Sequence, residues 1–248
     1  MFVEIIFIII GNIFGSFFNV VGLRLPQNKP FINDRSQCPH CNHQLTWYEL
    51  IPLLSYIFQG GKCRHCKVKI SPMYPLVEVL TGALFAISYI QYGFSMELII
   101  SLLLVSMLVI IFVTDINYML IPNKVLIFFL PFFIVLRIVE PLNPWWSSIT
   151  GAITGFAVIA IIILVSRGGM GAGDMKLFAV LGIVLGLQQV LLAFFLSCVI
   201  GAVIGILLIL LKRIDRKQPV PFGPYIVIGT LIAYFYGDSI VSWYLTNI

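Results

Sequence analysis

The chain has 248 residues, of which 60% are hydrophobic and 10% charged, whereas about 25% of residues are charged in an ordinary soluble protein. This composition excludes a cytosolic enzyme, a disordered chain and a secreted disulfide scaffold, and the continuous apolar runs disfavour a β-barrel. The net charge of +5 is expected to reflect membrane topology rather than binding to nucleic acid. We therefore predict an all-α polytopic membrane protein with no nucleic-acid partner.

Eight apolar runs are predicted to cross the membrane as helices, since about 20 apolar residues span its hydrocarbon core. They lie at residues 2–22, 75–92, 97–114, 123–139, 147–166, 176–187, 189–211 and 222–240. The charge-free stretch 177–211 would be about 50 Å long as one helix, which is too long for a single crossing. We therefore expect a helical hairpin there, with its break near Gly182, Gly186, Gln188 and Gln189.

These spans divide the chain into a first span at 1–23, a loop domain at 24–74 and a seven-span membrane domain at 75–248. Placing the loop domain in the cytoplasm puts 14 of the 15 basic residues inside and leaves only Arg137 outside, as expected from the positive-inside rule. The 14 residues are Arg24, Lys29, Arg35, Lys62, Arg64, Lys67, Lys69, Lys124, Arg167, Lys176, Lys212, Arg213, Arg216 and Lys217. Both termini are then external.

Four pairs of glycines with the spacing Gly-x-x-x-Gly are expected to let helices pack closely. They are Gly11/Gly15, Gly151/Gly155, Gly182/Gly186 and Gly201/Gly205. No chemistry is assigned to them.

Two Cys-x-x-Cys pairs occur in the loop domain, Cys38/Cys41 and Cys63/Cys66. Their separation is typical of a zinc site with four thiolate ligands, which is closed and structural rather than catalytic. The alternative is that one or both pairs are redox-active or unligated thiols. His40, His43 and His65 are expected to be bystanders, and Cys198 a small buried apolar residue.

Three acidic residues in or beside the spans are candidates for chemistry, because carboxylates are costly at membrane depth. Asp115 ends the third span, Asp174 opens the sixth, and Glu78 lies in the first turns of the second. The remaining acids are expected to be solvated helix ends or surface charges: Glu4, Glu97, Glu140 and Asp238 at outer ends, and Asp34, Glu49 and Asp215 in cytoplasmic loops.

Two crossings separate Asp115 from Asp174, so both return to the cytoplasmic face. Two carboxylates in one site share a proton, and the charged member can act as base while the protonated one acts as acid. This is aspartyl-protease chemistry and needs no metal. The glycine-rich run at 168–173 before Asp174 is expected to interrupt the helix and to let the backbone approach a substrate. A helix cap or a packing pair is the alternative role for these aspartates.

Two other functions are compatible with some of these residues. A proton- or cation-coupled transporter would use Asp115, Asp174 and Glu78, but it leaves the cysteine loop without a purpose and no repeated halves are visible. A membrane adaptor that binds a partner through the zinc loop would leave the glycine-rich sequence before Asp174 without a purpose.

Eight segments, in order along nearly the whole chain, resemble the bacterial type IV prepilin peptidases, which are GxGD-type aspartyl proteases. They are GNIFGSFFNVVGLRLP, SQCPHC, IPLLSY, GGKCRHCKVKIS, YPLVE, TDINYMLIPNKV, GMGAGDMKL and, at the last span, PFGPY. The resemblance implies an enzyme of the bacterial cytoplasmic membrane that removes the basic leader of prepilins or pseudopilins on the cytoplasmic side. Many members also methylate the new N-terminus with S-adenosylmethionine.

The resemblance further implies that Asp115 and Asp174 are catalytic and that the four cysteines hold zinc. Gly61 and Lys62 are candidates for the methyl-donor half, and Glu78, Gly171 and Gly173 for the substrate side. Capping of its own helix is the alternative role for Glu78. We expect the basic loop domain to contact anionic membrane lipid. Which prepilins are cut, whether methylation is retained and whether the chain self-associates stay open.

Overall fold

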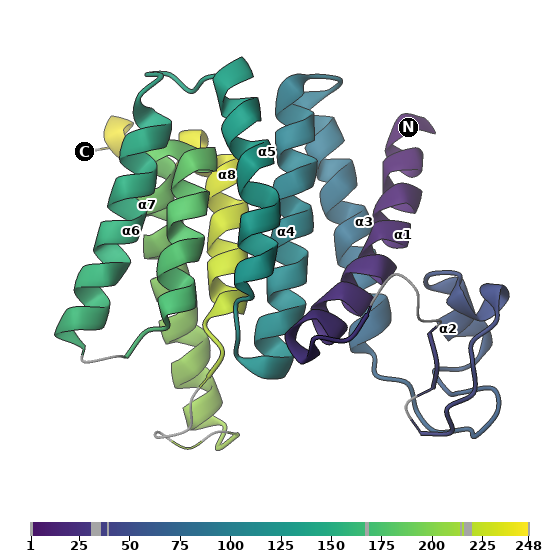
Figure 1. Cartoon of the computed structure of the whole chain (residues 1–248). Coiled ribbons are helices and arrows are strands. Elements are labelled where there is room, and N and C mark those ends of the chain that lie inside the picture. Colours follow the sequence, from purple (N-terminus) through teal and green to yellow (C-terminus); the bar gives the residue numbers. More distant parts are fainter. Residues whose placement is uncertain are drawn as a thin grey trace. The chain divides into compact units, whose positions relative to one another are not determined.

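The computed structural model describes residues 2–30, 36–38, 40–166, 169–213, 215 and 220–247. Its regular elements are all helical (Figure 1). They are α1 (Phe2–Arg24), η1 (Leu25–Gln27), η2 (Trp47–Leu50), α2 (Leu54–Phe58), α3 (Met73–Tyr92), α4 (Met96–Tyr118), α5 (Asn123–Val139), α6 (Ser147–Val165), α7 (Ala172–Leu210) and α8 (Gly223–Thr246). The predicted all-α membrane class is confirmed.

Some residues used in the sequence argument lie outside the described part of the chain. They are the basic residues Arg35, Arg167, Arg216 and Lys217, together with Asp34 and Gly168.

Six described helices are long and apolar enough to cross a membrane: α1, α3, α4, α6, α7 and α8. The apolar helix α5 has 17 residues and matches the predicted fourth span at both ends. α7 has 39 residues, which would reach about 58 Å as a straight rod. It is interrupted at Gly186, whose φ of 79° and ψ of 179° are not helical.

The interruption folds α7 into a hairpin. The ring centroids of Phe178 and Phe194 lie 5.7 Å apart, although 16 helical residues would separate them by about 24 Å. Gly155 of α6 is likewise in close contact with both Phe178 and Val190, one on each arm. With α5 and the two arms counted separately, the helices agree with the prediction of about eight spans.

The turn leaves backbone groups of α7 without hydrogen-bond partners in their own helix, and side chains of neighbouring helices bind them. The carbonyl of Val184 accepts hydrogen bonds from Nε and Nη2 of the buried Arg137 on α5, at 3.0 and 2.7 Å. The N–H of Leu187 donates to Oγ of Ser147, at the start of α6, over 3.1 Å. Gly186 has a left-handed φ, and a Cβ there would lie 2.5 Å from that Oγ. Only glycine fits this turn without strain.

The chain divides into two compact units, residues 1–113 and 114–248. In the first, α1 packs along α3 (Figure 1), and a Cβ on Gly11 would lie 2.7 Å from Cα of Gly82. In the second, α7 packs against α5, α6 and α8. The glycine prediction holds for most pairs, but it is wrong for Gly205, where a Cβ would have no neighbour within 4 Å.

Candidate active site and metal centre

The two cysteine pairs are built as copies of one backbone turn, 25 residues apart. In each copy the N–H of the first cysteine donates to the carbonyl five residues later, and the N–H four residues later donates back to that cysteine's carbonyl. Asn42 and Lys67 occupy the same place in the two turns, with φ of 55° and 61°. Isolated bridges close both turns, Gln37 with Gln44 and Lys62 with Lys69.

The turns bring the four cysteines together. Sγ of Cys38 lies 3.8 Å from Sγ of Cys66, Sγ of Cys41 lies 4.0 Å from Sγ of Cys63, and all four sulfurs are within 4.8 Å of one another. Four sulfurs held 2.3 Å from one tetrahedral ion would be about 3.8 Å apart. Backbone N–H groups of Cys41 and His40 lower the pKa of Cys38 to about 6. The cluster is therefore suited to a metal ion, and no histidine among the described residues belongs to it.

Glu49 lies in η2, shortly after the first cysteine turn, and the prediction that it is a surface charge is wrong. Its side chain is only 7% exposed. Oε2 accepts hydrogen bonds from the backbone N–H of Thr46 at 2.9 Å and from the Thr46 hydroxyl at 2.7 Å. These bonds, aided by the nearby His43, hold the pKa of Glu49 below its usual range. In the sequence, the sign of this role is the Thr-x-x-Glu spacing of a capping box.

Glu78 is buried in the first turns of α3, as predicted. Its Oε2 accepts a hydrogen bond from the backbone N–H of Leu53 at 2.9 Å, and the Ser16 hydroxyl of α1 donates to the same side chain. Leu53 precedes α2 and has an unusual positive φ of 61°. The carboxylate thus fastens the loop domain to α1 and α3, and it does not cap its own helix.

Asp115 lies in the last turns of α4 and is 6% exposed. Its Oδ2 accepts a hydrogen bond of 2.7 Å from the backbone N–H of Gly223, the first residue of α8. A Cβ on Gly223 would lie 2.6 Å from that oxygen. Glycine is therefore required for the backbone to approach the carboxylate this closely. Gly223 belongs to the segment PFGPY, and resemblance of that segment to the family does not by itself indicate the role of its glycine.

Asp174 lies in the first turn of α7 and is 8% exposed. Its Oδ2 accepts a hydrogen bond of 3.0 Å from the backbone N–H of Gly171. The expected interruption of helix extends only to Gly171, because Ala172 and Gly173 already belong to α7. Neither Gly171 nor Gly173 has a positive φ. A Cβ on Gly173 would lie 3.1 Å from Cβ of Ile121, so this glycine serves close packing beside Asp174.

Asp115 and Asp174 are near enough to interact electrostatically. Each carboxylate also faces the N-terminal end of a helix, where backbone N–H groups favour a negative charge. Both aspartates belong to the second unit, and their meeting in one site stays a prediction.

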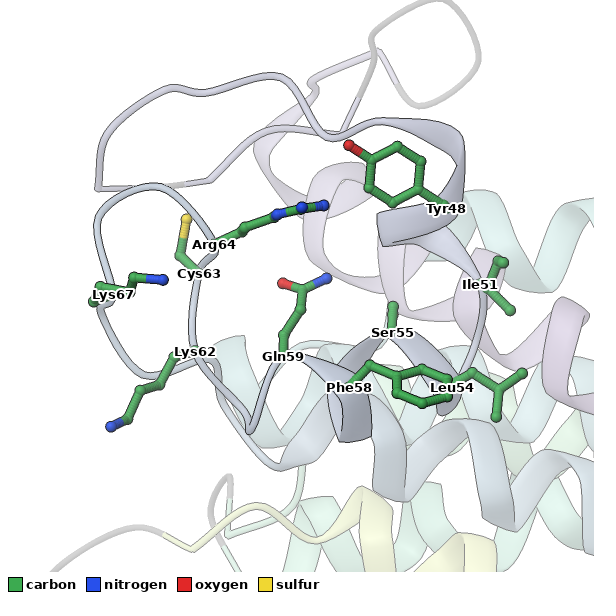
Figure 2. Close-up of a pocket in the computed structure, with 10 residues that line it drawn as sticks. All are labelled: Tyr48, Ile51, Leu54, Ser55, Phe58, Gln59, Lys62, Cys63, Arg64 and Lys67. Atoms are coloured by element: carbon green, nitrogen blue, oxygen red, sulfur yellow. The ribbon is translucent and has the colours of Figure 1, made fainter.

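Gly61 and Lys62 lie beside the second cysteine turn rather than near the aspartates in sequence. Both line a hollow of about 470 Å³ with Tyr56, Lys69 and neighbouring residues. Lys62 also lines a larger hollow of about 640 Å³, shown in Figure 2. Gly61 has a φ of 66°, and a Cβ there would lie 3.0 Å from the Tyr56 ring.

Comparison with known proteins extends these observations. The bacterial peptidase A24 N-terminal domain model matches residues 9–92, and the type IV leader peptidase family model matches residues 102–206. A prepilin leader peptidase/N-methyltransferase of Bacillus subtilis (strain 168) is 48% identical over 97% of both chains. Proteins with the same name from Aeromonas hydrophila and Stutzerimonas stutzeri are 39% and 32% identical, over 86% and 96% of this chain and 75% and 92% of their own. No solved structure matches the chain.

A multi-pass helical membrane protein with a buried aspartate pair and a four-cysteine cluster is thus the class that fold and site define. The chain belongs to the type IV leader peptidase family, and its activity is that of a peptidase.

Proposed function

We propose that the chain removes the leader peptide of prepilins or pseudopilins, with Asp115 and Asp174 as the catalytic pair. The observation that carries this proposal is that two buried carboxylates, 59 residues apart in sequence, interact with each other. The names of the relatives support a prepilin substrate.

Peptide hydrolysis needs one group to take a proton from water and another to give one to the substrate. The ionised aspartate accepts the proton as the water oxygen bonds to the peptide carbonyl carbon, and the protonated aspartate donates to the carbonyl oxygen. The C–N bond then breaks as one hydroxyl of the tetrahedral intermediate returns its proton to the now ionised carboxylate and the leaving amine takes the proton of the other carboxyl, so the pair returns to its starting state. The N–H groups of Gly223 and Gly171 each hold one Oδ2, so they orient the two carboxylates for these transfers.

We infer that this chemistry takes place at the cytoplasmic face of the membrane. α5 and α6 separate the two aspartates in the chain, so two crossings return it to the same side. The excess of Lys and Arg in the loop domain assigns that side to the cytoplasm. A prepilin has an apolar helix behind its basic leader. That helix can lie in the bilayer while the scissile bond reaches the aspartates at the interface.

We also propose that the four cysteines hold one Zn²⁺. Sulfur separations of 3.8 and 4.0 Å suit a tetrahedral ion of this size. With four protein ligands the ion has no open position for water, so it would supply folding stability to the loop domain and take no part in hydrolysis.

N-methylation of the new N-terminus is a second proposed activity. It is favoured by the second half of the relatives' names. The hollow at Gly61 and Lys62 combines the Tyr56 ring with two lysines, which suits a methyl donor such as S-adenosylmethionine with its adenine ring and carboxylate. Transfer of labelled methyl groups to a cleaved prepilin tests this activity. Lys62→Met should weaken it while leaving cleavage intact.

The peptidase proposal is tested by incubating the purified chain with a prepilin and measuring leader release. Asp115→Asn and Asp174→Asn should each lower the rate by at least about 10²-fold, since an amide can serve neither as base nor as acid. The double variant should be scarcely slower than either single one because the pair acts as a unit.

Asp215→Asn is the matched control, since Asp215 is exposed, and it should retain full activity. Near-normal processing by either active-site variant would refute the aspartyl mechanism. Transport of protons or cations that depends on the same aspartates, without leader release, would favour the transporter alternative instead.

A further inference from the structure

The segment 47–58 of the loop domain exposes large apolar side chains. Trp47 is 78% exposed and Phe58 85% exposed, and Leu54 and Ile57 between them are more than half exposed. We call this set the apolar face: Trp47, Tyr48, Leu50, Ile51, Leu54, Ile57 and Phe58. Single exposed apolar residues are ordinary, but a contiguous group of this kind marks a surface that meets a partner or a membrane.

A hollow of about 640 Å³ separates this face from the second cysteine turn. Figure 2 shows Tyr48, Leu54 and Phe58 along one side and the basic residues along the other. We call these basic residues the cationic rim: Lys62, Arg64 and Lys67. No acidic side chain lines the hollow. In the described part of the chain, neither Lys62 nor Lys67 is paired with a carboxylate, while Arg64 lies over the Tyr48 ring.

The apolar face lies level with the membrane-spanning part of the first unit. Leu53, which precedes α2, is hydrogen-bonded to Glu78, which is five residues beyond the start of α3. That is about 8 Å along the helix axis. On α3 itself the side chains of Leu76, Val79 and Leu80 around this level are exposed, as expected for residues that face lipid. The apolar face is thus tied to the first turns of a membrane-spanning helix, the end at which acyl chains and headgroups would meet.

We propose that the apolar face and the cationic rim bind an anionic phospholipid, with acyl chain against Leu54 and Phe58 and the headgroup phosphate at Lys62, Arg64 and Lys67. Residues 24–72 contain seven Lys or Arg and two acidic residues. They stay cationic even if four thiolates around Zn²⁺ add two negative charges. Trp and Tyr favour the membrane interface. A prepilin leader is basic and is repelled by the rim, so lipid is the occupant that the charges select.

Tryptophan fluorescence tests this proposal without reference to cleavage. The chain has four tryptophans, and Trp145→Phe, Trp146→Phe and Trp243→Phe leave Trp47 alone. The full chain is placed in nanodiscs that contain phosphatidylcholine and phosphatidylglycerol, with bromine on the acyl chains of one or the other. Trp47 should be quenched more strongly by brominated phosphatidylglycerol at equal mole fraction.

Replacement of the rim by Lys62→Gln, Arg64→Gln and Lys67→Gln should abolish this preference. Each basic residue near an anionic surface contributes about fivefold to partitioning. The preference for phosphatidylglycerol should therefore fall by more than about tenfold in the triple variant. Lys29→Gln, an exposed lysine outside the rim, should preserve the preference. An unchanged metal content in the triple variant establishes that its loop domain is folded.

Three results would overturn the proposal. Trp47 that is quenched by neither lipid would show that the apolar face is covered by protein instead. Equal quenching by both lipids, unaffected by the triple variant, would show that no headgroup is selected. Displacement of phosphatidylglycerol by added inorganic phosphate would identify a site for a free anion.

Discussion

The two units of the protein use buried carboxylates in opposite ways. The described residues bury four of them, Glu49 and Glu78 in the first unit and Asp115 and Asp174 in the second. Each glutamate accepts two hydrogen bonds from donors of its own unit, a backbone N–H and a hydroxyl.

Each aspartate instead accepts one backbone N–H and has the other aspartate as neighbour. A carboxylate whose oxygens are occupied by two donors serves to hold local structure, as Glu49 does at Thr46 and Glu78 does at Leu53 and Ser16. A carboxylate with one donor and a like-charged neighbour keeps oxygen available to exchange a proton. Burial alone therefore does not single out the proposed catalytic acids, whereas the surroundings of their oxygens distinguish them from the two glutamates.

The largest effect is expected from a change at Gly223, whose backbone N–H is the hydrogen-bond donor to Asp115. Gly223→Ala places a methyl group where the carboxylate now lies, 2.6 Å from Oδ2. The carboxylate must turn away, and leader release should fall by about 10²-fold or more, since acid–base groups act only when aligned. Gly205→Ala, which meets no neighbour, is the control. Full activity of Gly223→Ala would mean that the orientation of Asp115 is not set by α8.

Removal of the metal should damage the first unit and spare the chemistry of the second. Purified protein should contain about one zinc per chain, and Cys38→Ser or Cys66→Ser should lower that content and expose the loop domain to protease. Leader release should fall much less than in Asp115→Asn, because hydrolysis uses no metal. Protein with intact cysteines, purified without chelator and free of metal, would contradict the zinc assignment.

Glu78 should behave as a structural acid. Glu78→Leu leaves the N–H of Leu53 and the Ser16 hydroxyl without their acceptor, which costs about 1–3 kcal/mol. Faster hydrogen exchange over residues 47–58 measures this loss. Glu78→Gln keeps an acceptor oxygen and should restore most of the protection. If Glu78→Gln instead stops leader release while the loop stays protected, Glu78 belongs with the aspartates.

The smallest effect concerns Glu49 and acid. Because its pKa is lowered on folding, Glu49 stabilises the loop domain above its usual pKa of 4.5, and this contribution is lost as the pH falls through the lower folded value. Hydrogen exchange near Thr46 is measured in the native chain and in Glu49→Gln as the pH falls below 4.5. The difference between their exchange rates should become smaller with falling pH. A difference in exchange rate that grows as the pH falls would contradict a lowered pKa for Glu49.

Most of the helices could be predicted because their apolar runs are bounded by charges, prolines or glycines. The limits of α5 at Asn123 and Val139 agree with the prediction, and the hairpin follows from length alone. Counting crossings places Asp115 and Asp174 at the same face of the membrane, which allows them to pair. The resemblance added the chemistry that topology left open, where a helix cap was still an alternative.

Sequence could not reveal which acids receive backbone donors, because those donors come from distant segments. Nothing near Glu78 in the chain points to Leu53, and nothing near Asp115 points to Gly223. The prediction that Glu49 is a surface charge is wrong for a related reason. Its polarity suggested a surface position, but a threonine three residues earlier provides both of its hydrogen bonds and makes burial tolerable.

The hairpin turn at Gly186 has a consequence for the position of Asp174. Twelve residues separate the two, so the first arm of α7 is a rigid spacer of about 18 Å with the carboxylate at one end and the turn at the other. Arg137 and Ser147 fix the turn, and so they also fix the height and rotation at which Asp174 is presented. One residue inserted in this arm would raise Asp174 by about 1.5 Å and rotate it by about 100°. The length of that arm is therefore as strict a requirement as the aspartate itself.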